Sequence, residues 1–505
     1  MEVVKCMTPT ATQLLNKCNI NPVDIETDNS FIDLESVLNH MKKTPGPERT
    51  PVSMTYYSTD MFIDIFPKDS CRIRPYQKEI LEQVVQVDTS NNTMTVHPTL
   101  VVAPCGSGKT LSALCCVATC RKTTLIITNY KIVAYQWKTE ALKHFNISSN
   151  QVQCISDESF EFDHNNPPSI CIITYDTLTS SLTSFSRKLL HSLLLTSFGL
   201  IVLDEAHKSV AFSYHCILSR LSGLFLAFTA TPIREDSELK RMNQFVHSTF
   251  EIEAKALVKA GYISKISCST ILVPTDPLLT SSKLSHIQKI RAAVVNPNKI
   301  EYLNKLLATM TQNNERILIF CDDIWSLKYV FAKLKHQYPL LGPICMETTL
   351  ENREKFVRKF VEENDQCKIL LISRTGDEGL DIPCASKLIQ ICTPWGSRRQ
   401  HAQRVGRIQR AHNTSSKCEA ITIVSKDTIE VEFALKRDKY LKEMKYSMNT
   451  IDIADVTLQS ENTMEDLMHC IQKSTTRWKR PKKEKKQHKI TNNIQKLRRK
   501  LNKHH

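Results

Sequence analysis

The segment APCGSGKT at 103–110 has the composition of a loop that binds phosphate groups. An apolar run precedes it and a helical pattern follows it, so backbone N–H groups and a helix N-terminus would point at an anion. Lys109 would then reach the β and γ phosphates of a nucleotide, and Thr110 would ligate Mg²⁺. The strict pattern has glycine at the first position, so an ordinary glycine turn is the alternative. The expected nucleotide-binding residues are Ala103, Pro104, Cys105, Gly106, Ser107, Gly108, Lys109 and Thr110.

A second segment, DEAH at 204–207, follows another apolar run. In a parallel sheet the carboxyl ends of the strands meet at the ligand crevice. There Asp204 would hold Mg²⁺, Glu205 would orient or deprotonate an attacking water, and His207 would couple this centre to a second lobe. Taken alone, DEAH at a helix start can be an N-terminal charge cap. The phosphate loop upstream favours the catalytic interpretation.

The next apolar run ends in Thr229, Ala230 and Thr231. The two threonine hydroxyls would bridge the hydrolysis centre and a cleft between lobes. Threonines that merely terminate a strand are an equally good explanation.

Two further segments lie in the second half of the chain. TGDEGLDIP places Gly376, Gly379 and Asp381 on a turn after a strand, and we expect Gly379 and Asp381 to contact the nucleotide. In QRVGRIQR, helical spacing puts three side chains on one face, namely Gln403, Arg407 and Arg410. Guanidinium groups stabilise charge on a transferring phosphoryl group, so Arg407 and Arg410 are candidate arginine fingers. A solvated basic helix face is the alternative.

Two further residues near these motifs, a glutamine and a tryptophan, each allow more than one interpretation. Gln77, in RPYQ shortly before the phosphate loop, would read an adenine edge or lie on a helix surface. Trp137, in AYQWKTE, is expected to be a packing aromatic and not a base-stacking platform.

From residue 72 onward, short apolar runs alternate with helical patterns, which is typical of an α/β fold with parallel sheets. We predict two α/β domains with parallel sheets in tandem, with a short N-terminal arm and a basic C-terminal tail. The expected boundaries are a partly irregular N-terminal arm over 1–66, a nucleotide-binding domain over 67–236, a linker or small insert over 237–297, a second domain over 298–450, and a C-terminal extension over 451–505.

Composition agrees with a chain of this kind. Of 505 residues, 41% are apolar and 24% charged, and no apolar run approaches the roughly 18–20 residues that span a bilayer. The start lacks the pattern of a secretory signal. The 18 cysteines are scattered without C-x2-C spacing, so reduced thiols of a nuclear or cytoplasmic protein are expected. Glycine is scarce, with only 11 in the chain, and five of them fall in the motif segments. Sharp turns or close approach to phosphate explain that placement.

The motif set resembles superfamily-2 helicases, and within them the XPB group of DNA translocases from the general transcription and repair factor. RPYQKEIL, IREDSELK, AGYISKI, NPNK and GSRRQHAQRVGRIQRA resemble that group most specifically, and the similarity runs over about 70–445. The resemblance implies two RecA-like lobes with ATP and Mg²⁺ between them, duplex DNA across both, and 3′→5′ polarity. The arm before residue 70 is shorter than that of the eukaryotic subunit, as a viral or divergent homologue would have it. Residues that match the group's ATPase positions are Lys109, Thr110, Asp204, Glu205, Gln403, Arg407 and Arg410, and those that match its duplex-opening R-E-D element are Arg234, Glu235 and Asp236.

The expected partners are nucleic acid, with duplex DNA favoured over RNA, and transcription or repair machinery, with no membrane. An RNA or DNA–RNA hybrid helicase in transcription termination is the alternative, because such motifs contact phosphates more than bases. A non-catalytic nucleic-acid scaffold is disfavoured, because it would not need Lys109, Glu205 and Arg407 together.

Most of the net charge belongs to the C-terminus. Residues 477–505 contain thirteen Lys or Arg and one Glu, a net +12 of the chain's +15, so the remainder is nearly neutral at +3. A solubilising tail, a nuclear targeting signal and a phosphate-backbone contact all fit such a run. We predict that deletion of 477–505 weakens DNA binding mainly at low salt, or alters location, and leaves basal ATP hydrolysis nearly normal. Binding titrations at several salt concentrations check this, and a collapse of hydrolysis would contradict it.

Overall fold

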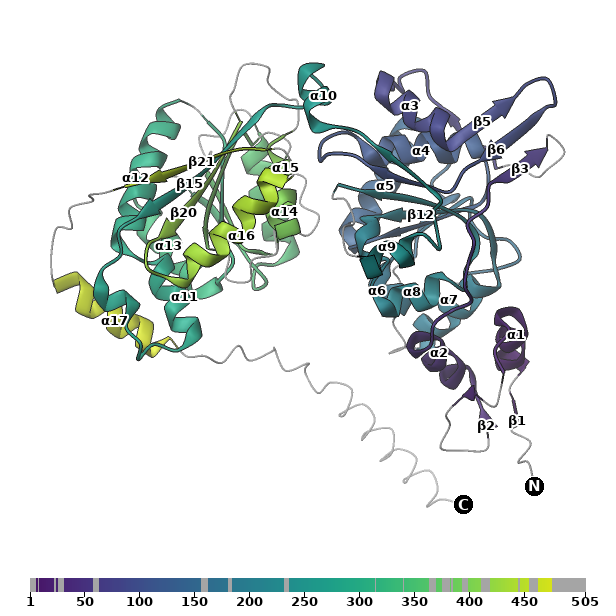
Figure 1. Ribbon diagram of the computed structural model, residues 1–505, viewed down its shortest axis with the longest axis horizontal. Coiled ribbons are helices and arrows are strands. Elements are labelled where there is room, and N and C mark those ends of the chain that lie inside the picture. The colour runs from purple at the N-terminus through teal and green to yellow at the C-terminus, as the bar shows by residue number, and fades with distance from the viewer. Residues whose placement is uncertain are drawn as a thin grey trace, which may run out of the picture.

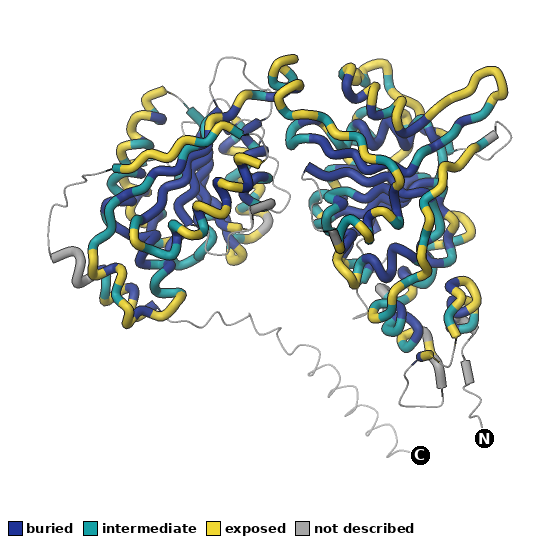
Figure 2. Tube along the Cα trace, in the orientation of Figure 1, coloured by how far each residue is buried: buried dark blue, intermediate teal, exposed yellow. Residues whose placement is uncertain are grey.

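The computed structural model consists of two lobes, each built on a seven-stranded parallel sheet (Figure 1). The inner strands of both sheets are buried, their edge strands are partly exposed, and the covering helices carry exposed residues on the outer side (Figure 2). This arrangement confirms the expectation of two RecA-like domains in tandem. The described residues are 6–7, 9–21, 24–25, 31–57, 63–155, 162–179, 184–230, 236–313, 315–338, 340–362, 369–374, 382, 385–392, 398–409, 418–443, 446–453 and 462–474.

The first lobe has the phosphate loop at the carboxyl end of one of its inner strands. Its sheet runs, from edge to edge, β10 (Val152–Cys154), β11 (Ile170–Thr174), β8 (Thr124–Thr128), β12 (Ser197–Asp204), β13 (Ser222–Thr229), β7 (Thr99–Val102) and β14 (Ser248–Glu251). Successive residues of β12 alternate between two hydrophobic clusters, which explains why the apolar runs are continuous. One face packs against α3 (Pro75–Val84), α4 (Lys109–Cys120) and α5 (Lys131–His144), and the other against α6 (Tyr175–Thr179), α7 (Ser184–Leu195), α8 (Phe212–Leu218) and α9 (Asp236–Met242).

The second lobe repeats this plan. Its sheet runs β17 (Leu340–Ile344), β18 (Ile369–Ile372), β16 (Ile317–Cys321), β19 (Lys387–Cys392), β20 (Cys418–Ser425), β15 (Ile266–Val273) and β21 (Ser447–Asp452). One face packs against α11 (His286–Val294), α12 (Pro297–Gln312) and α13 (Ile324–Leu334), and the other against α14 (Leu350–Val361), α15 (Arg398–Arg407) and α16 (Ile429–Glu443).

The N-terminal segment, expected to be a partly irregular arm over 1–66, contributes to the core of the first lobe. Helices α1 (Pro9–Cys18) and α2 (Leu34–Lys43) pack against α7 and α8 in the same hydrophobic cluster as one face of the first sheet. A small antiparallel sheet is formed by β3 (Met54–Tyr57), β6 (Thr93–Val96) and β5 (Val85–Asp88). The short elements β1 (Cys6–Met7) and β2 (Phe31–Ile32) pair with each other, as do β4 (Phe66–Pro67) and β9 (Phe145–Asn146).

The segment 237–297, expected to be a linker or insert, is divided between the two lobes. β14 adds to the edge of the first sheet beside β7, whereas β15 lies inside the second sheet between β20 and β21. Only the stretch around α10 (Ala254–Lys259) connects them, and η3 (Pro277–Thr280) and α11 already belong to the second lobe. The second domain therefore begins near residue 266, not 298. The second domain also extends beyond its expected end at residue 450, because α17 (Asn462–Lys473) packs against α11.

Among the described residues, none of the helices combines the length and apolar character needed to span a bilayer.

The packing of α2 predicts that its buried side chains stabilise the first lobe. Leu38 is fully buried in the cluster that includes Leu218 and Phe225, whereas Lys43 on the same helix is exposed. We expect Leu38→Ala to lower the free energy of unfolding by about 2–5 kcal/mol. Chemical denaturation followed by circular dichroism measures this, with Lys43→Ala as the control. Equal effects of the two substitutions would contradict the placement of α2 in the core.

Candidate active site

The phosphate loop connects β7 to α4, and its shape depends on two glycines. Gly106 and Gly108 have φ values of +77° and +76°, a region that favours glycine. A Cβ on Gly108 would also lie 2.7 Å from Nε2 of Gln77. Lys109, the first residue of α4, folds back and donates to the carbonyl oxygens of Ala103 at 3.1 Å and Pro104 at 3.2 Å. The lysine ammonium group thus lies over the loop that would hold the phosphates.

The start of α3 supports the loop from behind. The Tyr76 hydroxyl donates to the Ser107 carbonyl at 2.6 Å, and the Gln77 amide nitrogen lies 3.4 Å from the carbonyls of Ser107 and Gly108. Gln77 Oε1 accepts from the Arg74 backbone N–H, and only 4% of the residue is exposed. Gln77 is therefore not a helix-surface residue, and its amide holds the loop backbone. Its expected contact with adenine stays a prediction.

Asp204 lies at the carboxyl end of β12 beside a buried tryptophan. The Trp137 indole N–H donates to Asp204 Oδ2 at 2.9 Å, and the Tyr175 hydroxyl donates to the Asp204 carbonyl at 3.1 Å. Trp137 is 1% exposed, so it is a packing aromatic as expected, and it also makes a polar contact that its sequence context did not indicate. Burial raises the pKa of Asp204 to about 6, and the neighbouring charge of Glu205 adds to the rise.

Glu205 and His207 connect this carboxylate to the strand that ends in Thr229. Glu205 has a φ of +51°, and its Oε2 lies 3.4 Å from His207 Nδ1, which is also 3.4 Å from Thr229 Oγ1. Burial acts to raise the pKa of Glu205, but the contact with His207 and the charges of His207, Lys109 and Lys208 together outweigh it and hold that pKa below its usual value. The positive charge of Lys109 also favours the ionised forms of both carboxylates. The structure thus brings Lys109, Asp204, Glu205, His207 and Thr229 together.

The donors in this centre fit Mg²⁺. The cation prefers oxygen ligands and is usually held by one or two carboxylates plus substrate phosphates, without a dedicated protein cage. Asp204 offers a carboxylate with one oxygen already oriented by Trp137, and Thr110 offers a hydroxyl in the first turn of α4. The described residues contain no group of three or more His, Cys, Asp or Glu that could hold a metal ion.

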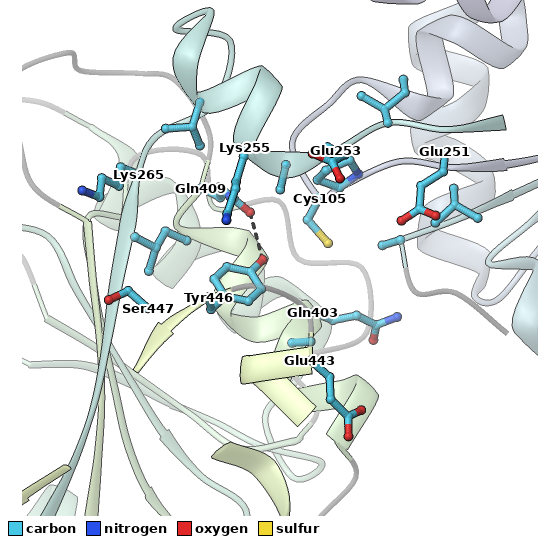
Figure 3. Close-up of a pocket in the computed structure, with 18 of the residues that line it drawn as sticks. Cys105, Glu251, Glu253, Lys255, Lys265, Gln403, Gln409, Glu443, Tyr446 and Ser447 are labelled. Atoms are coloured by element: carbon cyan, nitrogen blue, oxygen red, sulfur yellow. Dashed lines mark hydrogen bonds between the residues drawn. The ribbon is translucent and has the colours of Figure 1, made fainter. Parts of the chain in front are cut away.

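The second lobe contacts the phosphate loop through α15. A Cβ placed on Gly406 would lie 2.3 Å from the Cys105 Cβ and 2.7 Å from its Sγ, so the helix and the loop are in close contact there. A cavity of about 500 Å³ lies between the lobes at this point, and Figure 3 shows Cys105, Gln403 and Tyr446 around it. Gln403 lines the cavity, and Arg407 lies one turn further along the same helix. The cavity thus joins Cys105 of the phosphate loop to Gln403 of α15, whereas Lys109 and Arg407 are not among the residues that line it.

The opposite face of α15 holds the helix in place through residues that the motif did not single out. Arg404, 1% exposed, donates to Asp322 Oδ1 at 2.7 Å and Oδ2 at 3.3 Å, and its guanidinium lies 4.5 Å from the Phe320 ring centroid. His401 Nδ1 lies 2.5 Å from Gln390 Oε1. Ala402, Val405 and Ile408 are apolar and buried, so their spacing in the sequence marks the inward face of the helix. This spacing could have distinguished the inward-facing Arg404 from Arg407.

Several expected site residues lie outside the described residues. Asp236 begins α9, but its side chain is not described. The others are Thr231, Arg234, Glu235, Gly376, Gly379, Asp381 and Arg410.

Comparisons with known proteins give two family matches that cover most of the chain. Residues 70–234 match the family described as type III restriction enzyme, res subunit, and residues 257–503 match the ERCC3/RAD25/XPB C-terminal helicase family. The two matches divide the chain at the connection between the sheets.

Curated relatives are helicase/translocase subunits XPB of the general transcription and DNA repair factor IIH. The chain is 29% identical to that of Enterocytozoon bieneusi over 407 residues, which cover 78% of this chain and 64% of the relative. Identity is 29% to that of Dictyostelium discoideum, with 77% and 48% covered, and 26% to XPB/SSL2 of Saccharomyces cerevisiae, with 77% and 46% covered. The chain thus spans about half to two thirds of the length of these relatives.

Two solved structures share the fold. The helicase domain of Pyrococcus furiosus Hef superposes with a TM-score of 0.50 at 14% identity, over 72% of this chain and 97% of that one. The DEAD-box helicase Mss116 bound to ssRNA and UDP-BeF superposes with a TM-score of 0.52 at 17% identity, over 78% and 76%. At such identities the likeness supports the fold alone.

Because Gly406 and Cys105 are in close contact, we predict that a larger side chain at position 406 would hinder closure of the two lobes and slow nucleotide hydrolysis. In Gly406→Ala the new methyl group would overlap Cys105, and such overpacking costs about 1–3 kcal/mol. We expect hydrolysis to fall by about tenfold or more, since 1.4 kcal/mol corresponds to a factor of ten. Steady-state hydrolysis and binding of a fluorescent nucleotide together separate a lost closure from a damaged loop.

The matched control is Cys105→Gly, which removes both atoms that the new methyl group would meet. The double variant is expected to hydrolyse nucleotide as fast as Cys105→Gly alone. Wild-type hydrolysis by Gly406→Ala would show that the two lobes do not need this contact.

Proposed function

The chain belongs to the XPB-like group of superfamily-2 helicases, and on this premise we propose that it is an ATP-dependent motor that acts on duplex DNA. The observation that supports the proposal most strongly is the contact of α15 with the phosphate loop. Gly406, which meets the loop, lies between Gln403 and Arg407 in α15, and this supports the proposal that both side chains act on a nucleotide held by the other lobe. A triphosphate held there would be contacted by both lobes, so its hydrolysis would change how they sit together.

In the proposed hydrolysis, each residue has a distinct role. The N–H groups of the loop and the Lys109 ammonium bind the phosphates, and the cation that Asp204 and Thr110 would hold neutralises negative charge on them. Glu205 has a pKa held below its usual value, so it is ionised at neutral pH and able to accept a proton from the attacking water. Arg407, with Arg410, supplies positive charge to the γ-phosphoryl group during transfer.

The coupling of hydrolysis to movement is proposed to run through His207. Its Nδ1 lies 3.4 Å from Glu205 Oε2 and 3.4 Å from Thr229 Oγ1, and Thr229 is followed by Ala230, which lines the cavity between the lobes. A change at Glu205 therefore has a direct route to the cleft. By resemblance, Thr231 continues this route, and Arg234, Glu235 and Asp236 would contact the duplex where it opens.

The proposed setting is transcription or DNA repair, in the nucleus or cytoplasm. The curated relatives are named as subunits of a transcription and repair factor, which supports this setting. Because the chain spans only about half to two thirds of their length, assembly with the same partners is a separate proposal.

The test is ATP hydrolysis measured with duplex DNA, single-stranded DNA and RNA in parallel. We expect duplex DNA to stimulate turnover most. Lys109→Ala is the control and should lower stimulated turnover by about 10²-fold or more, the usual cost of removing one group that stabilises developing charge. Absence of stimulation by any nucleic acid would refute the motor. Stimulation by RNA alone would replace the DNA substrate with RNA, and unchanged turnover in Lys109→Ala would refute the site.

A further inference from the structure

One side chain of helix α5, Trp137, reaches the proposed nucleotide site although it belongs to none of the sequence motifs that define that site. Trp137 is 1% exposed and packs in the cluster under the first sheet with Ala134 and Ala141 of the same helix. From there its indole N–H reaches Asp204 Oδ2 at 2.9 Å, across 67 residues of sequence. A hydrogen bond to an ionised carboxylate contributes roughly 1.5–3 kcal/mol, more than a neutral one.

The chemistry of indole suits it to fix one carboxylate oxygen. It has a single N–H donor and no acceptor, and its rigid ring is fixed by packing, so the donor keeps its direction. A carboxylate has about four lone-pair sites, so one donor leaves room for a cation at the same group. The contact therefore limits rotation of the Asp204 side chain without occupying the whole carboxylate.

A second contact ties α5 to the same segment. Tyr130 precedes the first residue of α5, and the Lys208 ammonium lies 4.7 Å from its ring centroid. Lys208 ends the 3-10 turn η2 (Ala206–Lys208) that follows Asp204 and Glu205. Trp137 of α5 and Tyr130 just before it thus contact the first residue of the DEAH segment and the residue that follows the segment.

We propose that Trp137 is a positioning residue for Asp204, which orients the carboxylate so that its remaining oxygen faces the Mg²⁺ that accompanies the nucleotide. This inference rests on the proposed nucleotide site, but it does not require that the chain move on DNA.

The test compares Mg²⁺ dependence in variants that keep or lose the indole N–H. Trp137→Phe retains an aromatic ring and removes the donor. We expect the Mg²⁺ concentration for half-maximal binding of a fluorescent ADP analogue to rise by about 10-fold or more, in line with a lost hydrogen bond to a charged group. Binding of the same analogue in EDTA should stay within about twofold of wild type, because the phosphate loop is untouched; a factor of two is about 0.4 kcal/mol.

The matched control is Trp325→Phe, which makes the same substitution at a tryptophan that stacks on Tyr329 in the second lobe. It should bind the analogue with the Mg²⁺ dependence of wild type. If Trp137→Phe does not fold, judged by circular dichroism, benzothienylalanine at position 137 keeps the shape of indole and replaces the N–H with sulfur. Unchanged Mg²⁺ dependence in the folded variant would overturn the proposal.

A double-mutant cycle separates positioning from a general effect on packing. Asp204→Asn weakens cation binding itself, and in that background Trp137→Phe should cause no further loss of Mg²⁺ dependence. Additive losses would mean that Trp137 acts through the core and not through Asp204, and would overturn the proposal.

The outcomes also separate this inference from the proposed function. If the Mg²⁺ requirement depends on Trp137 but no nucleic acid stimulates hydrolysis, the positioning role stands and the proposed motor function is refuted. If nucleic acid stimulates hydrolysis but the Mg²⁺ requirement does not depend on Trp137, the motor function stands and the positioning role is refuted.

Discussion

The approach of α15 to the phosphate loop is the contact on which the rest of the architecture depends. Gly406 has no side chain, and Cys105 occupies the space that one would need. The inward ion pair of Arg404 with Asp322 fixes the helix from its own lobe, while Gly106 and Gly108 fix the loop from the other. Two surfaces that are each held rigidly by their own sheet can meet at van der Waals distance only in a defined orientation.

A second line of contacts joins the same two surfaces by a longer route. The loop carbonyl of Ser107 is bound by Tyr76, and Arg74 of the same segment donates to the Tyr262 carbonyl at 3.2 Å. Two residues on, the Ser264 N–H donates to the Gln409 carbonyl at 2.9 Å, just beyond the end of α15. The connection between the lobes is therefore in contact with both partners of the nucleotide site.

The motif residues were predictable because their chemistry leaves few substitutes, and the strands because both faces of each sheet are covered. The unpredicted parts have physical reasons. β14 is short and half-exposed, and β15 alternates polar and apolar residues, so neither resembled the continuous runs of the other strands. Trp137 and Arg404 act on carboxylates 67 and 82 residues away, and such pairs follow from the fold and not from local sequence.

The division of 237–297 between the sheets sets a limit on how far the lobes can separate. The chain leaves the first sheet at Glu251 and enters the second at Ile266, with α10 between. Fully extended, that stretch spans about 50 Å, but only about 40 Å while α10 stays helical. Both anchor points lie within sheets, one of them beside the strand that ends in the phosphate loop. A wider separation of the two lobes would require α10 to unwind. This six-residue helix therefore limits the distance between the two sheets for as long as it stays folded.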